Sequence, residues 1–430
     1  MFSPARPPHR KVFYAVLLSL GLLWAGHSSY FLCPTPAPAS GEERDELGRP
    51  TFAEVREHER SLPQHKSAVG AVRYLHLPDE AWGGGLNNVF QAVLINTHLA
   101  YLMHRGYVFK DYVAHSHPPF PDALSSGTRD PLRIPMNAIT SGPTGSGSLG
   151  TGTNEAVTPR AISQDRWDEV CPASKVVVVE LDATNAELNI TGDTGGLAKM
   201  ERWAAKSRDM EAPCVKITGG EPFDWMIIAS TKILELWPSY GSSPTLKEFA
   251  WSALVTRALS RNFSLLSSVS NRPALLSPFL PRISSSWTGF GNPPDYLDVL
   301  EGKTRSEAAY EHCWPTAEAI VRRALAVRAD SASGKDFGSQ RLTAVYIATN
   351  GEPEWIAVLV ALFKRNGWDR VSTSLDMELA PEEYAVSQVV DMSVMVAAES
   401  FIGVGFSSLT SNVVQLRLAA GRHPGTTRFW

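Results

Sequence analysis

Apolar positions near the C-terminus follow a helix, strand, helix pattern. From Val389 to Ala398 they occupy most faces of a predicted helix, as in a buried helix. Ser400 to Val404 is short, apolar and bounded by glycine, which is typical of a parallel strand. Ser407 and Ser408 follow where an N-cap belongs, and a second helix is expected from about Leu409 to Ala420. The turn between them would lie at the carboxyl end of a parallel strand, where α/β sheets bind ligands and free N–H groups suit a phosphate. The alternative is a plain capping turn that binds nothing.

A similar pattern opens the globular part. Arg73 to Leu77 is predicted to be a strand, and the glycine-rich turn Gly83-Gly-Gly-Leu-Asn-Asn88 follows it. Apolar residues then recur at helical spacing up to Arg105, and Tyr107 to Phe109 begins another strand. The turn lacks the G-x-G-x-x-G spacing, so it is not a dinucleotide fingerprint. Its glycines permit a close backbone approach or a positive φ, or they only allow a sharp turn.

Strand and helix patterns alternate through the rest of the chain. Lys175 to Leu181 is predicted to be a buried strand, and Leu342 to Ala348 another. Such alternation indicates parallel, doubly wound sheets. We therefore expect an α/β fold with two Rossmann-like domains facing a cleft, residues 67–275 and 276–430. Their connection falls in the stretch from Ser270 to Pro294, which is rich in Pro, Ser and Asn.

The stretch from His115 to about Thr158 is rich in Pro, Gly, Ser and Thr. A loop of this length inside a compact domain is usually functional or disordered. We interpret it as a mobile lid or an acceptor-side loop, with surface disorder as the alternative.

The N-terminus predicts a membrane anchor. Residues 12–32 are uncharged, mostly apolar and long enough to span a bilayer. Basic residues precede them and mainly acidic residues follow, so the positive-inside rule predicts a cytosolic tail at 1–11. Residues 33–66, rich in Pro, Gly and charge, would form a stem. The chain is therefore expected to be a single-pass type II protein of the Golgi or endoplasmic reticulum membrane with a lumenal globular part. A cleaved signal peptide is the alternative.

Two further features fit an oxidising lumen. Asn189-Ile-Thr and Asn262-Phe-Ser are N-glycosylation acceptors, so we predict a glycoprotein. Cys171 and Cys214 are candidates for a disulfide, although Cys313 leaves three pairings open.

The chain carries few signs of the common catalytic centres. It has 430 residues, 43% of them hydrophobic, and a formal net charge of −4, which gives no reason to expect nucleic acid as a partner. It contains no G-x-S-x-G elbow, H-E-x-x-H, P-loop or C-x-x-C motif. It also has no Asp-x-Asp pair that would hold a metal against a diphosphate. We expect no metal, and any diphosphate would be bound by N–H groups, hydroxyls and Arg.

Several motifs together resemble the GDP-fucose protein O-fucosyltransferase family, and its divergent fungal members in particular. The glycine turn before a helix resembles the family's GG-x-x-N-(Q/N) element. Its C-terminal pattern is matched by Tyr346-Ile-Ala-Thr-Asn350, Asp391 and Phe401-Ile-Gly-Val-Gly-Phe-Ser-Ser408 with Arg417. The resemblance implies a GT-B fold, with an N-terminal acceptor-side domain and a C-terminal donor-nucleotide domain. It also implies metal-independent, inverting transfer of fucose from GDP-fucose to a hydroxyl of a protein or glycan acceptor.

The resemblance also assigns roles by position. Ser407 and Ser408 would contact the diphosphate, Asp391 would help to hold the nucleoside, and Asn87 or Asn88 would line the cleft. The full donor-binding set that it implies is Gly84, Gly85, Asn87, Asn88, Asp391, Phe406, Ser407, Ser408 and Arg417.

The family's arginine motif is altered in this chain. Counting back from His312-Cys313 places Arg305 on the catalytic arginine, but Lys303 replaces the motif's histidine and its Gly-Asp is missing. Arg305 would stabilise the leaving phosphate if the site is active. The alternatives are a degenerate protein that binds nucleotide or glycan without transfer, and a faulty gene model of this segment. The sequence does not separate fucose from another GDP-sugar such as GDP-mannose.

Overall fold

The computed structural model describes residues 51–62, 72–79, 84–114, 132–147, 160–208, 210–223, 227, 230–266, 315–333, 342–404 and 407–429. The predicted tail and membrane anchor lie outside them, and no helix of the described part is long and apolar enough to cross a bilayer. One part of the predicted stem is different from expectation. Helix α2 (Phe52–Ser61) belongs to the folded unit that begins at Pro50, and Arg56 forms an ion pair with Asp111 of that unit.

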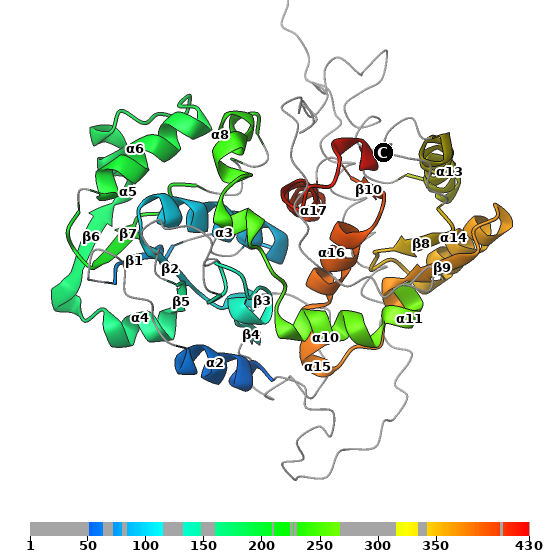
Figure 1. Cartoon of the computed structure of the whole chain (residues 1–430), viewed down its shortest axis with the longest axis horizontal. Coiled ribbons are helices and arrows are strands. Elements are labelled where there is room, and N and C mark those ends of the chain that lie inside the picture. The colour runs from blue at the N-terminus through cyan, green and yellow to red at the C-terminus, as the bar shows by residue number, and fades with distance from the viewer. Residues whose placement is uncertain are drawn as a thin grey trace, which may run out of the picture. The chain divides into compact units, whose positions relative to one another are not determined.

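A five-stranded parallel sheet with the order β5-β2-β1-β7-β6 organises the N-terminal half (Figure 1). The strands are β1 (Tyr74–His76), β2 (Gly106–Phe109), β5 (Ile162–Ser163), β6 (Val176–Glu180) and β7 (Cys214–Thr218). The predicted strand, helix, strand unit is confirmed as β1, α3 (Leu86–Leu102) and β2. Because all five strands are parallel, their carboxyl ends share one edge, where ligands of such sheets bind.

Helix α3 is the most deeply buried helix element of this half. Every residue from Phe90 to Ala100 is buried, including the polar residues Gln91, Asn96 and His98. Helices of both halves of the chain contact it. A helix that is apolar around most of its circumference needs such cover on all sides.

The remaining elements of this half surround the sheet. Figure 1 shows α3 and α6 on one face and α4 on the other. A disulfide joins Cys171 at the end of α4 to Cys214 of β7, with an S–S distance of 2.00 Å, which is one of the three pairings that the sequence left open. The bounds are β3 (Tyr112–Ala114), β4 (Leu132–Ile134), η2 (Met136–Ala138), α4 (Gln164–Val170), η3 (Ala173–Lys175), α5 (Leu181–Glu187), α6 (Gly196–Arg208), α8 (Lys232–Tyr240), α9 (Pro244–Lys247), α10 (Ala253–Arg261) and α11 (Phe263–Leu266).

Two predictions about this half need correction. β6 is a strand as expected, but among the described strands it lies at the edge of the sheet, and Val177 and Val178, which point to opposite faces, are exposed rather than buried. The stretch interpreted as a mobile lid or an acceptor-side loop is, in its described part at 132–147, packed into the fold rather than disordered at the surface. β4 pairs with β3, and Ile134 and Ile139 belong to the hydrophobic core.

The C-terminal half contains two parallel strand pairs rather than one continuous sheet in its described part. β8 (Ala344–Ile347) pairs with β9 (Arg370–Thr373), and β10 (Phe401–Gly403) pairs with β11 (Thr427–Phe429). The expected doubly wound sheet is therefore present only as parallel units joined through helices. The other elements are α13 (Ala317–Ser333), α14 (Pro353–Arg365), η4 (Ser374–Asp376), α15 (Pro381–Ala385), α16 (Ser387–Ala397), α17 (Ser408–Ala419) and η5 (Pro424–Thr426).

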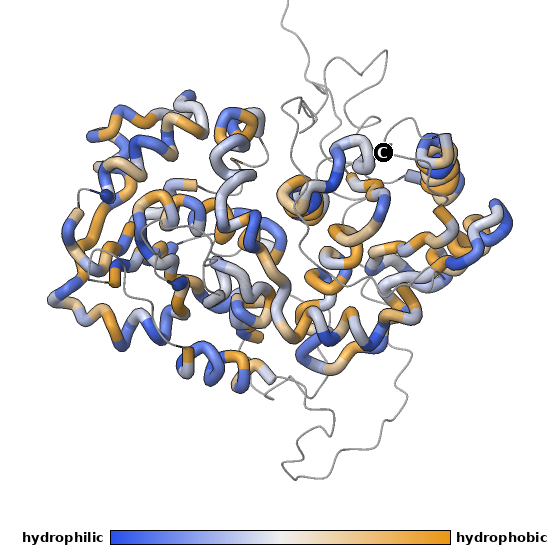
Figure 2. Tube along the Cα trace, in the orientation of Figure 1, coloured by the Kyte–Doolittle hydropathy of each residue, from blue (hydrophilic) through white to orange (hydrophobic). Residues whose placement is uncertain are grey.

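One hydrophobic core extends from the first half into the second. It includes Phe90 and Leu254 together with Val389, Phe401 and Val413. Figure 2 shows hydrophobic positions within α16 and α17, the helices that supply the C-terminal part of this core. The predicted boundary at 275–276 lies outside the described residues and stays a prediction, but the described elements on either side of it pack as one unit from Pro50 onward.

A buried ion pair reinforces this packing. Arg261 of α10 donates to both carboxylate oxygens of Glu383 in α15, and Glu383 also accepts from the N–H of Ala380. The carboxylate is thus paired and hydrogen-bonded, as a buried charge requires.

Acid should destabilise this fold through His98. Burial lowers the pKa of His98 from 6.5 to about 3. The unfolded chain binds this proton more tightly, so the stability gained from the neutral ring is complete above pH 6.5 and is lost as the pH falls towards 3. Between pH 7 and pH 4.5 the loss from His98 is about 2–3 kcal/mol.

Urea unfolding of wild type and of His98→Gln, each at pH 7 and at pH 4.5, measures this contribution of His98 to stability. The variant should lose about 2–3 kcal/mol less on acidification than the wild type. His104→Asn, at an exposed position just beyond the same helix, is the matched control and should retain the wild-type loss. Equal acid losses in His98→Gln and wild type would contradict the assignment.

Candidate functional site

The first turns of α3 and α17 lie against each other. Nε2 of Gln91 donates to the carbonyl of Ser408 at 3.2 Å, and Nδ2 of Asn412 donates to the carbonyl of Asn87 at 3.0 Å. Residue 87 therefore lies near 412, and residue 91 near 408, so the two helices cross in opposite directions. We call this contact the α3–α17 junction. Each helix follows the carboxyl end of a parallel strand, β1 or β10, which is where both motifs were expected to act.

A chain of hydrogen bonds stabilises the junction from inside. The hydroxyl of Tyr240 donates to Oε1 of Gln415 at 3.0 Å, and Nε2 of Gln415 donates to Oδ1 of Asn412 at 2.8 Å. Asn412 then donates to Asn87, as described above. Complete burial raises the pKa of Tyr240, so its hydroxyl remains a donor. The junction is thus fixed by side chains of α8 and α17 that are hydrogen-bonded to the backbone of α3.

The two predicted serines have different roles at the start of α17. Oγ of Ser407 accepts from the N–H of Thr410 at 3.4 Å, which makes Ser407 the N-cap. The side chain of Ser408 has no hydrogen-bond partner in the described part of the chain and is half-buried. Gly403 permits the close packing here, because a Cβ at this position would lie 2.4 Å from Cγ2 of Thr410. Ser408 is therefore the hydroxyl at this turn that is left for a ligand.

The glycine turn presents an uncapped helix N-terminus. Gly85 is the N-cap of α3 and supplies no side-chain hydrogen bond. Its φ of −62° is ordinary, and a Cβ there would meet nothing within 4 Å, so neither positive φ nor close packing within the described chain requires a glycine. Gly84 borders a cavity that is described below. The open space beside Gly85 leaves the first N–H groups of α3 accessible to an anion.

The predicted asparagines lie in the same turn. Nδ2 of Asn87 donates to Oε1 of Gln388 in α16 at 3.2 Å, whereas its Oδ1 is buried without a hydrogen-bond partner. Asn88 is half-buried and has no side-chain partner among the described residues. The structure therefore brings Asn87 and Asn88 to the junction with Ser408.

Asp391 connects the loops that follow β8 and β9. Its carboxylate accepts from the hydroxyl of Tyr346 at 2.5 Å and from Oγ of Ser374 at 2.9 Å, and Ser374 in turn accepts from the N–H of Thr349. Burial raises the pKa of Asp391 to about 6, and the two hydrogen bonds oppose that rise. Burial, and then the charge of Asp391, raise the pKa of Tyr346. Asp391 thus positions two strand-end loops, and both its oxygens already accept hydrogen bonds.

Arg417 does not face a ligand, contrary to the prediction. It is 0% exposed, and its guanidinium donates to the carbonyls of Met395, Val396, Ala398 and Glu399 and to Thr426. Burial lowers its pKa to about 10. The guanidinium satisfies the carbonyls at the end of α16 and fixes the turn before β10, so its role is structural.

Other predicted site residues have different outcomes. Arg305 and Phe406 lie outside the described residues. Asn189 is exposed at the end of α5, where a glycan has room. Asn262 is only 5% exposed, its Nδ2 donates to the carbonyls of Ala258 and Glu378, and its Oδ1 accepts from Glu378. The prediction of a glycan on Asn262 conflicts with this structure, because the amide nitrogen that would carry it is buried and bonded.

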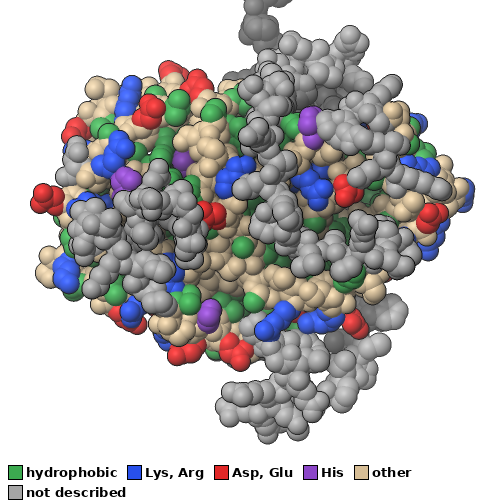
Figure 3. Space-filling view, in the orientation of Figure 1, with side chains coloured by type: hydrophobic (Ala, Val, Ile, Leu, Met, Phe, Trp, Pro, Cys, Tyr) green, Lys and Arg blue, Asp and Glu red, His purple; other side chains and the backbone are tan. Residues whose placement is uncertain are grey.

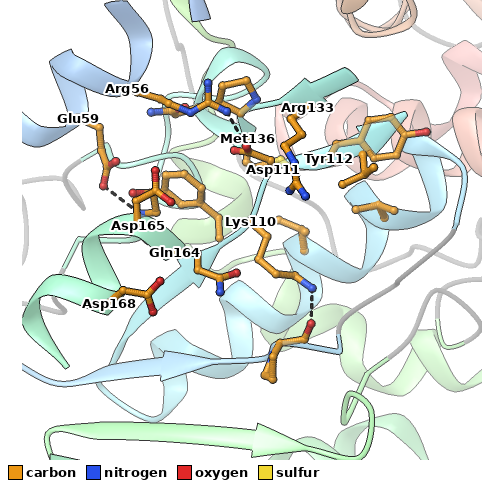
Figure 4. A pocket seen from close by; sticks show the side chains of 18 of the residues that line it. Arg56, Glu59, Lys110, Asp111, Tyr112, Arg133, Met136, Gln164, Asp165 and Asp168 are labelled. Carbon is orange, nitrogen blue, oxygen red and sulfur yellow. Dashed lines mark hydrogen bonds and ion pairs between the residues drawn. The ribbon is translucent and has the colours of Figure 1, made fainter. Parts of the chain in front are cut away.

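Sequence patterns gave no sign of a cavity of about 350 Å³ at the carboxyl ends of β1, β2 and β5 (Figure 4). Its side chains come from α2, α3, β2, β3, β4, η2, β5 and α4, which extend over more than 100 residues of the sequence, and no motif joins them. The residues around it are Arg56, Glu59, Pro78, Gly84, Val89, Val93, Phe109, Lys110, Asp111, Tyr112, Val113, Arg133, Pro135, Met136, Asn137, Ser163, Gln164, Asp165 and Asp168.

The charged groups around these sites are of both signs. Figure 3 shows acidic and basic side chains interspersed on the face it presents. Within the described part of the chain no three His, Cys, Asp or Glu side chains are grouped closely enough to hold a metal ion.

The fold and the junction define an α/β protein with parallel sheets and two motif-bearing strand ends in contact. No protein-family model and no curated protein matches the chain. Solved structures of POFUT1 are similar to it. The complex with GDP-fucose is 15% identical, with a TM-score of 0.46 over 84% of this chain and 97% of that one. The complex with GDP is 15% identical, with a TM-score of 0.45 over 83% and 98%. The function proposed for this chain therefore rests on its own residues.

The structural role of Arg417 leads to a test. Arg417→Lys keeps the charge but removes the planar fork, leaving several buried carbonyls without donors. We expect a loss of about 3 kcal/mol in the free energy of unfolding, measured by urea titration. The GDP affinity of the folded variant should be that of the wild type. Arg422→Lys, next in space but partly exposed, is the matched control and should lose less. A variant of wild-type stability that binds GDP more weakly would return Arg417 to the donor site.

Proposed function

We propose that this chain is a glycosyltransferase of the GT-B type that uses a GDP-sugar as donor. The observation that carries the proposal is the α3–α17 junction. It joins the two motifs that resemble the O-fucosyltransferase family, although more than 300 residues separate Asn87 from Asn412 in the sequence. Nothing in local sequence requires these motifs to meet, whereas a shared nucleotide-sugar site does.

The chemistry of the junction suits a diphosphate. It offers the N-terminus of α17, whose N–H groups and dipole favour negative charge. It adds the hydroxyl of Ser408 and the amides of Asn87 and Asn88, all neutral groups that hydrogen-bond to phosphate oxygens. Asp391, the carboxylate assigned to the donor, is bound by Tyr346 and Ser374, which limits its repulsion of a phosphate.

In the proposed reaction the donor is GDP-fucose. A hydroxyl oxygen of the acceptor forms a bond to C1 of fucose as the bond from C1 to the β-phosphate oxygen breaks. The electron pair of the broken bond leaves with GDP, the hydroxyl proton passes to a base, and the configuration at C1 inverts. The role proposed for Arg305 is to stabilise the charge that develops on the β-phosphate. The acceptor is a protein or a glycan, and no metal is required.

The second candidate function is binding of nucleotide or glycan without transfer. The altered arginine motif favours it, since Lys303 replaces a histidine and the Gly-Asp is missing. For either function we propose the Golgi or endoplasmic reticulum membrane as location, with residues 12–32 as anchor and the globular part in the lumen. The Cys171–Cys214 disulfide is consistent with an oxidising compartment.

Donor binding by calorimetry tests the proposed function. The protein is titrated with GDP, GDP-fucose, GDP-mannose and a UDP-sugar, and we expect selective binding of the GDP compounds. Ser408→Ala removes about one hydrogen bond and should weaken GDP by about 1 kcal/mol, roughly fivefold. Ser260→Ala on α10 is the control, because this serine is exposed and distant in sequence from Ser408. This variant should bind GDP as the wild type does. Unaltered GDP affinity in a well-folded Ser408→Ala protein would remove Ser408 from the site.

Arg305 is tested by turnover. Arg305→Ala should lower the turnover of GDP-fucose on the order of a hundredfold and affect GDP affinity much less, because the charge it would stabilise develops only during departure of GDP. Arg322→Ala, an exposed position on α13, serves as the control. Wild-type turnover in Arg305→Ala would exclude the proposed role, and binding without turnover in the wild type would favour the second candidate function.

A further inference from the structure

Two deeply buried side chains with acceptor oxygens form what we call the floor of the cavity beside the glycine turn. Glu59 is 3% exposed, and its Oε1 accepts from the N–H of Ser163 at 2.9 Å, which leaves the carboxylate further acceptor capacity. Asn137 is 8% exposed, and its Nδ2 donates to the carbonyl of Val55, while its Oδ1 is buried without a partner. A buried oxygen such as Oδ1 of Asn137 normally has a donor. A ligand that fits the cavity should therefore supply hydrogen-bond donors to its floor.

The wall of the cavity offers both donors and acceptors. Gln164 and Asp168 of α4 and Arg133 of β4 have no partner in the described part of the chain. Figure 4 shows Gln164 and Asp165 on one side and Lys110 and Arg133 on the other. A ligand here meets a carboxylate, an amide and a guanidinium, so its groups must both donate and accept.

The charges in the cavity nearly cancel. Arg56 is paired with Asp111, and the ammonium group of Lys110 donates to the carbonyl of Pro78 at 2.5 Å. The other carboxylates around the cavity, those of Glu59, Asp165 and Asp168, offset the positive charge of Arg133. A phosphate would meet the oxygens of Glu59 and of the α4 carboxylates, whereas a Lys or Arg side chain would lie near Arg133. An uncharged ligand rich in hydroxyl groups avoids both conflicts.

We propose that this cavity binds one sugar residue of a glycan acceptor. Its volume of about 350 Å³ is at the small end for ligand sites, which suits a single sugar unit. Sugar hydroxyls donate to Glu59 and Asn137 and accept from Arg133 and Gln164. The role as acceptor site rests on the proposed glycosyltransferase function, whereas sugar binding can be measured on its own.

Helix geometry places this sugar next to the acceptor sugar that reacts, and not at the donor itself. Val89 and Val93 face the cavity, while Asn87 and Gln91 face the α3–α17 junction. Residues two apart on a helix point about 200° away from each other, so the two sites lie on opposite sides of α3. The short way between them passes Gly84 and Gly85, which carry no side chains themselves, and a Cβ at Gly85 would meet no described atom within 4 Å. The cavity thus holds one sugar of the glycan, and a second sugar of the same glycan extends around the N-terminus of α3 to the donor.

The test is binding of methyl glycosides to the full chain in detergent, by saturation-transfer NMR. The panel contains glucosides, galactosides, mannosides, xylosides and N-acetylglucosaminides, each with and without GDP. We expect at least one glycoside to bind, and its affinity to fall about tenfold or more in Gln164→Ala/Asp168→Ala. Asp182→Ala, an exposed carboxylate on α5, is the matched control. Hydrogen exchange of the wild type should show protection at 132–137 and 163–168 with the bound glycoside, which needs no variant.

The outcomes separate this proposal from the proposed function. If the wild-type protein binds GDP but none of the glycosides, the cavity proposal alone is overturned. Failure to bind GDP, with glycosides bound, would overturn the proposed function and leave the cavity as a sugar site. Binding of an Arg- and Lys-containing peptide that the double variant weakens, with no glycoside binding, would replace the sugar by a peptide.

Discussion

The hydrogen-bond chain from Tyr240 through Gln415 and Asn412 to Asn87 is the interaction on which the rest of this structure depends. Three helices that are distant in sequence meet through it, and its three side chains, those of Tyr240, Gln415 and Asn412, are fully buried, while Asn87 accepts through its backbone carbonyl. A buried amide that loses its partner leaves the other partner unsatisfied as well, so the chain permits one register of α17 against α3. Apolar packing alone, which is not directional, would not distinguish that register from its neighbours.

Because the register is fixed, two short motifs acquire a common geometry. Gly85 ends a turn after β1, and Ser407 caps the helix after β10. Each is an ordinary helix start when taken alone. The junction brings these two helix starts into contact through α3 and α17, at two strand ends, which is the usual position for a ligand in α/β proteins.

The elements with strong local patterns were predictable. The strands β1 and β2 with α3 between them, and β10 with α17, follow directly from periodicity and capping residues. The stretch 132–147 was misinterpreted because Gly, Ser and Thr are equally common in mobile loops and in tight buried turns. A Cβ at Gly145 would lie 1.8 Å from the carbonyl oxygen of Thr140, so this glycine is required by close packing. Only tertiary contacts distinguish the two cases.

The candidate site was harder to predict because residue type does not determine the direction of a side chain. Arg417 and Ser408 occur in one motif, but Arg417 turns inward to the carbonyls at the end of α16, while Ser408 has no partner among the described residues. Likewise the Asn262 acceptor motif is intact, although the fold buries its amide against Glu378. A guanidinium group or a side-chain amide can donate hydrogen bonds to backbone carbonyls as well as to a ligand.

The cavity was equally hard to predict, because its residues come from eight elements and share no spacing in the sequence. What joins them is the parallel sheet, which brings the carboxyl ends of β1, β2 and β5 to one edge. Helix α3 then divides that edge, with Val89 and Val93 on the cavity side and Asn87 and Gln91 on the junction side. A helix whose buried face is almost continuous can serve two sites at once, because each face is covered by a different part of the chain. The glycines before α3 are the point where the two sites approach each other, and their lack of side chains matters for this reason more than for backbone conformation.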